Sequence, residues 1–462
     1  MVAKKFLIST YGCQLNEHDS ERIAGQLVGE GMEATTEVDD ADVIIFNTCT
    51  IRENADTKFY AHLGHLKTLR EQNPDLVIAV GGCMAQAQGG AIMERVGHVD
   101  LVFGTHNVGE VSNLIAEVRK SGKLVAVPDE PAPSGGDLDQ ALTAVRALPF
   151  TAWVTLQTGC NNTCAYCIVP DVRGGEVSRP FADVVTEVNE LAKRGVTEVT
   201  LLGQNVNSYG RDLTGRGPLF ANLLRAVGEV EGIRRVRYTS PHPKDLRPDV
   251  MAAMAETDAV CEQLHLPLQS GSNRVLSAMR RGYTAERYLE KLRAARALIP
   301  DLAVTTDLIV GFPGETHDEF EETLEVAAAA DWDSSFTFIF SPREGTRAAK
   351  MIEDFVPQDV VAERFARLIG VVERSALRRH QERVGRDEEV LVLGPSKTDA
   401  ALVSGRTRQG KLVHFAAPKE ASLAGAYAQV TITYGARHHL LGEYRELLSA
   451  PRHRRSIPLL AR

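Results

Sequence analysis

The chain has 462 residues, which is too long for a single ordinary hydrophobic core, so two to four domains are expected. Its composition, 44% hydrophobic and 24% charged, is that of a soluble globular protein, and its apolar runs are shorter than the about 18 residues that span a bilayer. The net charge of −9 excludes a globally basic nucleic-acid-binding protein. Nothing at the N-terminus resembles a signal peptide, so we expect a cytoplasmic protein whose seven cysteines serve metal or catalytic roles rather than disulfides.

The first segment, residues 3–119, is predicted to form an open parallel α/β sheet. Short apolar runs typical of buried parallel strands alternate with helical stretches. The strands are expected at 6–9, 43–46, 76–80 and 101–103, and the helical stretches include 20–29 and 54–72.

One cysteine follows each of the first three predicted strands: Cys13, Cys49 and Cys83. The carboxyl ends of parallel strands meet at one edge of a sheet, so these thiols are expected to converge. A single cysteine after a strand is usually a small buried apolar residue. Three in equivalent places favour a three-thiolate site.

Residues 120–148 are rich in proline, glycine and acidic side chains and are predicted to be a linker. The central segment, residues 149–378, repeats strand and helix about six times, which predicts a partial (β/α)6 barrel with its chemistry at the carboxyl ends of the strands. The strands are expected at 151–157, 198–202, 236–239, 261–268, 303–310 and 335–340, and the helices include 182–194, 285–298 and 319–329.

A second cysteine set, Cys160, Cys164 and Cys167, follows the first predicted barrel strand with C-x3-C-x2-C spacing. Three thiolates can hold three irons of a 4Fe–4S cluster and leave the fourth iron open to an outside ligand. This spacing, with an aromatic residue before the last cysteine, resembles the radical S-adenosylmethionine (SAM) enzymes. The alternatives are a zinc knuckle and buried structural thiols.

The last segment, residues 379–446, alternates short β stretches at 389–393, 412–415 and 427–433 with glycine-rich turns, which predicts a small OB-like β-barrel. Residues 447–462 are predicted to be a flexible basic tail. Residues 381–462 hold 13 lysines and arginines against 8 aspartates and glutamates, which fits either a phosphate-contacting surface or an ordinary solvated face.

Ordered motifs across residues 3–446 resemble the methylthiotransferases, which carry an N-terminal cluster domain, a radical SAM barrel and a C-terminal TRAM domain. The motifs lie at residues 11–16 (Tyr-Gly-Cys-Gln-Leu-Asn), 47–53 (Asn-Thr-Cys-Thr-Ile-Arg-Glu), 82–86 (Gly-Cys-Met-Ala-Gln), 173–180, 265–272 (His-Leu-Pro-Leu-Gln-Ser-Gly-Ser), 307–316 and 341–343. The first three are similar to the MiaB branch, although Leu15 stands where that branch commonly has methionine.

The resemblance implies conversion of N6-isopentenyl(dimethylallyl)adenosine at position 37 of tRNA, beside the anticodon, to its 2-methylthio derivative. It implies two 4Fe–4S clusters, with Cys160, Cys164 and Cys167 holding the SAM-cleaving one and Cys13, Cys49 and Cys83 the sulfur-carrying one. Two SAM molecules would be used per turnover, one as the source of the 5′-deoxyadenosyl radical and one as the methyl donor. The unactivated C2–H bond of adenine needs such cofactor chemistry.

The resemblance and the positions at strand ends also suggest cofactor and RNA contacts, for which plain turn or packing roles are the alternative. The residues expected to contact SAM are Tyr166, Gly203, Gln204, Asn205, Gln269, Ser270 and Gly311. Arg173 and Arg179 would bind the SAM carboxylate or a tRNA phosphate, unless they form ion pairs. Residues expected to contact RNA phosphates are Arg406, Arg408 and Lys411, whereas Cys261 and His265 are interpreted as core residues.

The implied partners are the tRNA anticodon loop, an electron donor such as flavodoxin or ferredoxin, and a sulfur donor, with no membrane and a monomeric chain. Two other functions remain open at this point. One is methylthiolation of a ribosomal-protein aspartate, which the N-terminal motifs disfavour. The other is a non-catalytic iron–sulfur RNA-binding protein.

Overall fold

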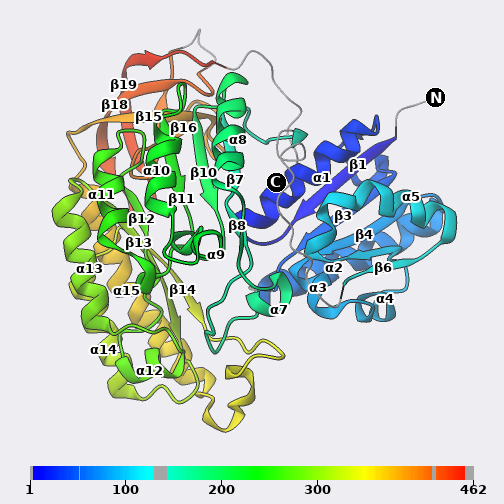
Figure 1. Cartoon of the computed structure of the whole chain (residues 1–462), viewed down its shortest axis with the longest axis horizontal. Helices are drawn as coiled ribbons and strands as arrows, with labels where there is room; N and C mark the ends of the chain where they lie inside the picture. The colour runs from blue at the N-terminus through cyan, green and yellow to red at the C-terminus, as the bar shows by residue number, and fades with distance from the viewer. Residues whose placement is uncertain (1–3, 51–52, 129–142, 419–422, 453–462) are drawn as a thin grey trace.

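The computed structural model describes residues 4–50, 53–128, 143–418 and 423–452. The chain forms an N-terminal α/β lobe, a larger central lobe, and a small C-terminal barrel on one end of the central lobe (Figure 1). Residues 129–142 of the predicted linker, 453–462 of the predicted tail, and Ile51 and Arg52 of the second motif lie outside the described residues. No helix in the described ranges is long and apolar enough to cross a membrane.

The N-terminal lobe is a parallel sheet, as predicted, with two more strands than expected. Its strand order is β2 (Glu33–Ala34), β1 (Lys5–Thr10), β3 (Val43–Thr48), β4 (Val77–Gly82), β5 (Leu101–Phe103) and β6 (Leu124–Ala126). Every residue of the two central strands, β3 and β4, is buried, which explains their unbroken apolar character. Strand β6 lies inside the predicted linker, so the first part of that segment belongs to the sheet.

Helices cover both faces of this sheet and create a separate apolar core on each. The helices α1 (Gln14–Gly29) and α5 (Val111–Ser121) pack on one face, and α2 (Glu53–Gln72), α3 (Cys83–Gln88) and α4 (Ala91–Arg95) pack on the other. Helix α1 begins six residues earlier than predicted, directly after Cys13. Cys13, just before α1, therefore lies at the carboxyl edge of the sheet.

The central lobe contains six parallel strands around one core, which confirms the partial barrel. Its strands are β7 (Thr151–Thr155), β10 (Glu198–Leu202), β11 (Arg235–Tyr238), β12 (Gln263–His265), β13 (Ala303–Val310) and β14 (Ser334–Ile339). Its longer helices are α8 (Phe181–Lys193), α10 (Phe220–Gly228), α11 (Pro248–Glu256), α13 (Ala285–Leu298), α14 (His317–Ala330) and α15 (Gln358–Gln381). A single parallel bridge between Val236 and Val260 joins the two halves of the sheet.

The fourth barrel strand is shorter than the predicted run of residues 261–268. Strand β12 covers only Gln263–His265. Pro267 has no N–H to donate to a neighbouring strand, and Gln269 adopts a positive φ of 77°. The chain therefore leaves the regular ladder early, although Gln269 rejoins it through one bridge to Leu308.

The C-terminal segment is a closed five-stranded barrel, which confirms the predicted small β-barrel. Its strand order is β15 (Asp387–Pro395), β16 (Val403–Thr407), β17 (Leu412–Ala416), β19 (Leu440–Ser449) and β18 (Tyr427–Gly435). The sequence analysis did not identify β16 or β19, and β19 extends to Ser449, inside the segment predicted to be a flexible tail.

The small barrel closes the amino-terminal end of the central barrel, opposite the strand ends that carry the predicted chemistry (Figure 1). Its side chains contact residues that lie at or just before the start of each central strand. These residues are Phe150, Thr197, Arg235, Glu262, Asp301 and Asp333. Arg235 and Arg237 of β11 donate to the backbone carbonyls of Arg406, Thr407 and Arg408, at the end of β16 and the start of the turn that follows it.

Candidate iron–sulfur and SAM site

The C-x3-C-x2-C loop lies at the carboxyl-terminal end of the central barrel, between β8 (Gln157–Thr158) and α7 (Val169–Arg173). The sulfurs of this loop accept hydrogen bonds. The Asn162 backbone N–H and side-chain amide lie 3.5 and 3.4 Å from Cys160 Sγ, and Arg281 Nη1 lies 3.3 Å from Cys164 Sγ. Such donors stabilise thiolates, the form in which cysteine binds iron.

Burial opposes ionisation of two free thiols in this loop, Cys160 and Cys167. It raises the pKa of Cys160, and it raises the pKa of Cys167 to about 12 even though the Val169 backbone N–H donates to that sulfur. Without a ligand, these two thiols are therefore protonated at neutral pH. Binding of a metal cluster would remove these protons, because a coordinated thiol is deprotonated outright.

Arg281, which the sequence analysis did not identify, supplies a buried positive charge beside this loop. Only 6% of Arg281 is exposed, and its guanidinium contacts the Tyr283 hydroxyl as well as Cys164 Sγ. Its positive charge opposes the effect of burial on the pKa of Tyr166. It lies 114 residues after Cys167 in a short turn, so no local pattern in the sequence points to it.

The second cysteine set lies at the carboxyl edge of the N-terminal sheet, where it was expected. Cys13 precedes α1, Cys49 follows β3, and Cys83 is the first residue of α3. Gly12 has a φ of 145°, and a Cβ atom on it would lie only 2.6 Å from the Cys49 Cβ. Only glycine permits the two loops to approach this closely.

Arg173 joins the second cysteine set to the helix that follows the first set. This last residue of α7 is 7% exposed, and its Nη2 lies 2.9 Å from Asp19 Oδ2 of α1. Burial raises the pKa of the Cys83 thiol, while the Arg173 guanidinium, which hydrogen-bonds to it, opposes that rise. Helix α7 also packs on α3, which starts at Cys83, so both sets border one interface between the two lobes. Arg173 thus forms an ion pair, and that ion pair borders the second cysteine set.

Within the described residues, no group of three or more His, Cys, Asp or Glu side chains is arranged to hold a metal ion. The fit to clusters rests instead on the donor sets. Each set contains three cysteines on loops at strand ends, together with one buried arginine that hydrogen-bonds to a cysteine of that set. Thiolates are the ligands that iron–sulfur clusters use.

Two of the residues predicted to bind SAM have unsatisfied polar atoms at the end of β10. Both side-chain polar atoms of Gln204 and the Oδ1 atom of Asn205 are buried and have no hydrogen-bond partner among the described residues. The Asn205 amide nitrogen donates to Asp245 at 2.9 Å. Buried polar groups are normally paired, so these atoms fit a polar ligand at this strand end.

The other predicted SAM residues are mostly engaged within the chain. The Ser270 hydroxyl is fully buried and lies 3.3 Å from the Thr323 hydroxyl, and Gln269 is buried at its positive φ. A Cβ atom on Gly311 would lie 2.6 Å from a Val361 methyl, and one on Gly203 would lie 3.0 Å from Gln157 Cγ, so both glycines allow close packing. Tyr166 is half-buried against an apolar cluster.

The prediction that Arg179 binds the SAM carboxylate or a tRNA phosphate is not supported by its contacts. Its Nη1 lies 2.6 Å from Glu187 Oε2 of α8 and 2.8 Å from the Thr155 carbonyl oxygen, and the residue is only 3% exposed. A guanidinium held in an internal ion pair does not reach a SAM carboxylate or a tRNA phosphate. The alternative interpretation, an ion pair, describes this residue.

Two of the three residues predicted to contact RNA lie against the central barrel. The Lys411 ammonium is buried and lies 2.7 Å from Asp333, and Arg408 pairs with Glu262 and donates to the carbonyl oxygens of Asp258 and Val260. These contacts occupy both cations, so a phosphate role for them is not supported. Arg406 is exposed.

The two remaining residues singled out in the sequence are a buried cysteine and a hydrogen-bonded histidine. Cys261 is 1% exposed, and burial raises the pKa of its thiol. His265 is half-buried, with its ring nitrogens 2.9 Å from the Thr305 hydroxyl and 3.3 Å from Asp307.

Known protein families match both lobes. The Radical SAM superfamily matches residues 154–327, and a family described as "Uncharacterized protein family UPF0004" matches residues 5–104. A Mycolicibacterium vanbaalenii protein named tRNA-2-methylthio-N(6)-dimethylallyladenosine synthase is 49% identical over 452 residues, which cover 96% of this chain and 88% of that protein. The chain belongs to this family.

Other members and more distant folds agree with this assignment. A Mycolicibacterium smegmatis protein of the same name is 47% identical, over 95% of this chain and 87% of that protein. The radical SAM methyltransferase TsrM from Kitasatospora setae superposes with a TM-score of 0.55 at 15% identity, over 75% of this chain and 77% of that one, which shows the fold alone.

Membership makes this chain a radical SAM enzyme of the tRNA methylthiotransferase class, and the cofactors of that class are SAM and 4Fe–4S clusters. Neither the ribosomal-protein alternative nor the non-catalytic alternative is favoured.

Proposed function

We propose that this chain installs the 2-methylthio group on N6-isopentenyladenosine at position 37 of tRNA, with the two cysteine sets as ligands of two separate clusters. The observation that supports it best is the 49% identity to a relative of that name over nearly the whole chain. The packing of α7, which starts two residues after Cys167, on α3, which starts at Cys83, supports the assignment of roles within the chain.

When bound, the clusters and SAM would supply the radical and the methylated sulfur. The chain's own residues would bind and orient the clusters and SAM and shield them from solvent. Cys160, Cys164 and Cys167 would hold one cluster at the barrel mouth, where Gln204 and Asn205 offer unpaired polar atoms to SAM. Cys13, Cys49 and Cys83 would hold the other cluster across the interface, beside Arg173.

The substrate adenine must reach the space between the cysteine sets, so an unstacked loop nucleotide is the fitting target. An electron donor of the flavodoxin or ferredoxin type, a sulfur donor, a monomeric chain and a cytoplasmic location complete the proposal.

Anaerobic reconstitution tests it directly. The cluster-loaded enzyme, given reductant, SAM and tRNA that carries the isopentenyl group, is expected to yield the methylthio nucleoside in mass spectrometry of digested tRNA. Cys164→Ala should abolish SAM cleavage, whereas Cys49→Ala should keep cleavage and lose the methylthio product. Cys261→Ala is the matched control and should retain both. Absence of the product with the intact enzyme would refute the proposal.

A further inference from the structure

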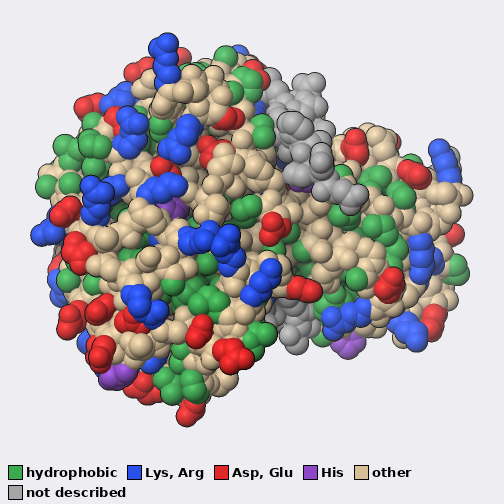
Figure 2. Space-filling view, turned by 60° about the horizontal axis from the view of Figure 1, so that its bottom comes forward, with side chains coloured by type: hydrophobic (Ala, Val, Ile, Leu, Met, Phe, Trp, Pro, Cys, Tyr) green, Lys and Arg blue, Asp and Glu red, His purple; other side chains and the backbone are tan. Residues whose placement is uncertain are grey.

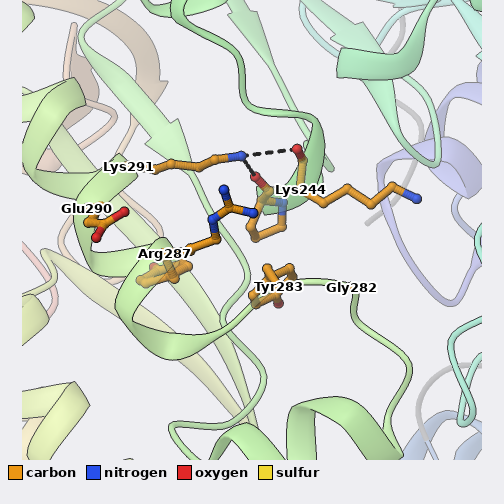
Figure 3. A pocket seen from close by; sticks show the side chains of 8 residues that line it. Lys244, Gly282, Tyr283, Arg287, Glu290 and Lys291 are labelled. Carbon is orange, nitrogen blue, oxygen red and sulfur yellow. Dashed lines mark hydrogen bonds between the residues drawn. The ribbon is translucent and has the colours of Figure 1, made fainter.

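A small cavity opens beside the cysteine loop at the carboxyl-terminal end of the central barrel. Its volume is about 300 Å³, and it lies between the short helix η4 (Pro243–Asp245), which follows β11, and the start of α13 (Figure 3). Its wall includes Lys244, Tyr283, Arg287, Glu290 and Lys291. The side chain of Lys244 donates to Asn162 of the cysteine loop, so the cavity adjoins the proposed radical site.

Two cations of this wall, Arg287 and Lys291, are near enough for the Arg287 charge to lower the pKa of Lys291, whereas Lys244 extends away from both towards Asn162 (Figure 3). Lys291 Nζ donates to the carbonyl oxygens of Pro243 and Lys244, at 2.6 and 3.0 Å, which holds the ammonium in the wall (Figure 3). Among the described residues, none accepts a hydrogen bond from the Arg287 guanidinium. The carboxylate whose charge acts on Lys291 is Asp245, which is itself paired with Arg211. An anion bound by Arg287 would reduce the repulsion between Arg287 and Lys291.

The positive charges also lower the pKa of a neighbouring buried histidine, His242. Burial, together with the smaller effects of the Arg281, Lys244 and Lys291 charges, lowers the pKa of His242 to about 2, so its ring stays neutral at physiological pH. This local field contrasts with the net charge of −9 for the chain. Lysine and arginine side chains also gather over the middle of the larger lobe in the space-filling view (Figure 2).

We propose that this cavity binds a backbone phosphate of the RNA substrate close to the nucleotide that reacts. The inference rests on the proposed function and deepens it. The planar Arg287 guanidinium can hold a phosphate through two parallel hydrogen bonds, with the Lys291 ammonium as a second positive charge in the same wall. The base next to a phosphate held at this rim would have the barrel mouth within reach.

The test measures binding rather than turnover. An anticodon stem–loop RNA is titrated into the full-length, cluster-loaded protein under anaerobic conditions at several salt concentrations. Arg287→Gln should weaken binding about fourfold to sixfold at 0.15 M salt and lower the slope of log K against log salt by about 0.7–0.9, because one phosphate contact is lost. The control Arg293→Gln, on the same helix but outside the cavity, should leave both quantities unchanged.

If Arg287→Gln bound the RNA with the affinity and the salt slope of the wild type, the inference would be overturned. So would unchanged RNA binding combined with slower reduction by an acidic redox protein, because the cavity would then serve the electron donor. Failure of the proposed function is a separate result, since it appears as a missing methylthio product in the wild type whatever Arg287→Gln does to RNA binding.

Discussion

Replacing Arg173 by glutamine should both weaken the fold and loosen the second cluster site. The Arg173–Asp19 pair is 2.9 Å long, and the two side chains are 7% and 8% exposed. Removal of one partner of a buried pair leaves an unpaired buried charge and typically costs about 3–5 kcal/mol. The same change removes the positive charge that opposes the burial-driven rise in the pKa of Cys83, so thiolate formation becomes harder.

The assay combines denaturant unfolding with iron analysis for Arg173→Gln, Asp19→Asn and the double variant. The two single losses should sum to clearly more than the loss in the double variant, since the second change removes the charge that the first leaves unpaired. Iron should fall from about eight towards about four atoms per chain. The exposed pair of Arg225 and Glu256 is the control, because Arg225→Gln should cost no more than about 1 kcal/mol. Strict additivity, together with full iron content in Arg173→Gln, would refute this reasoning.

Three further predictions concern single residues. Burial lowers the pKa of His380 to about 4, below its unfolded value of 6.5, so stability should fall by up to about 3 kcal/mol as pH drops from 6.5 to 4, and a pH series of unfolding should flatten in His380→Gln; an equal slope in the variant would contradict this. Gly12→Ala should lower iron content because its Cβ meets Cys49, whereas Gly64→Ala, which meets nothing within 4 Å, should retain full iron. Cys261→Ala should lower stability by about 1–2 kcal/mol with unchanged iron; loss of iron would make it a ligand.

The sequence predicted the parallel strands and the cysteine positions well because both depend on local patterns. Strands β3 and β4 are buried along their whole length, so their apolar runs stand out. The thiols then follow from a rule of topology, since loops at the carboxyl ends of parallel strands share an edge. The short edge strands β2 and β6 are only partly buried, and neither was identified.

The polar contacts could not be predicted in the same way, because their partners are distant in the chain. Lys411 and Arg408 stand in a polar turn that looks solvent-exposed, yet Asp333 and Glu262 lie 78 and 146 residues away from them. Arg179 was misassigned for a related reason. Its partner Glu187 is only eight residues away, but the burial of both groups becomes evident only in the packed structure.

The position of the C-terminal barrel sets a length scale for whatever RNA it touches. It lies at the amino-terminal ends of the central strands, while the cysteine loop lies beyond their opposite ends, and the eight residues of β13 extend about 26 Å. A nucleotide or short oligomer bound to the C-terminal barrel could not also place a base beside the cysteine loop. Only a folded RNA long enough to run along the outside of the lobe could contact the C-terminal barrel and the cysteine loop at once. Such a contact would let the enzyme select its substrate by shape before the target base binds.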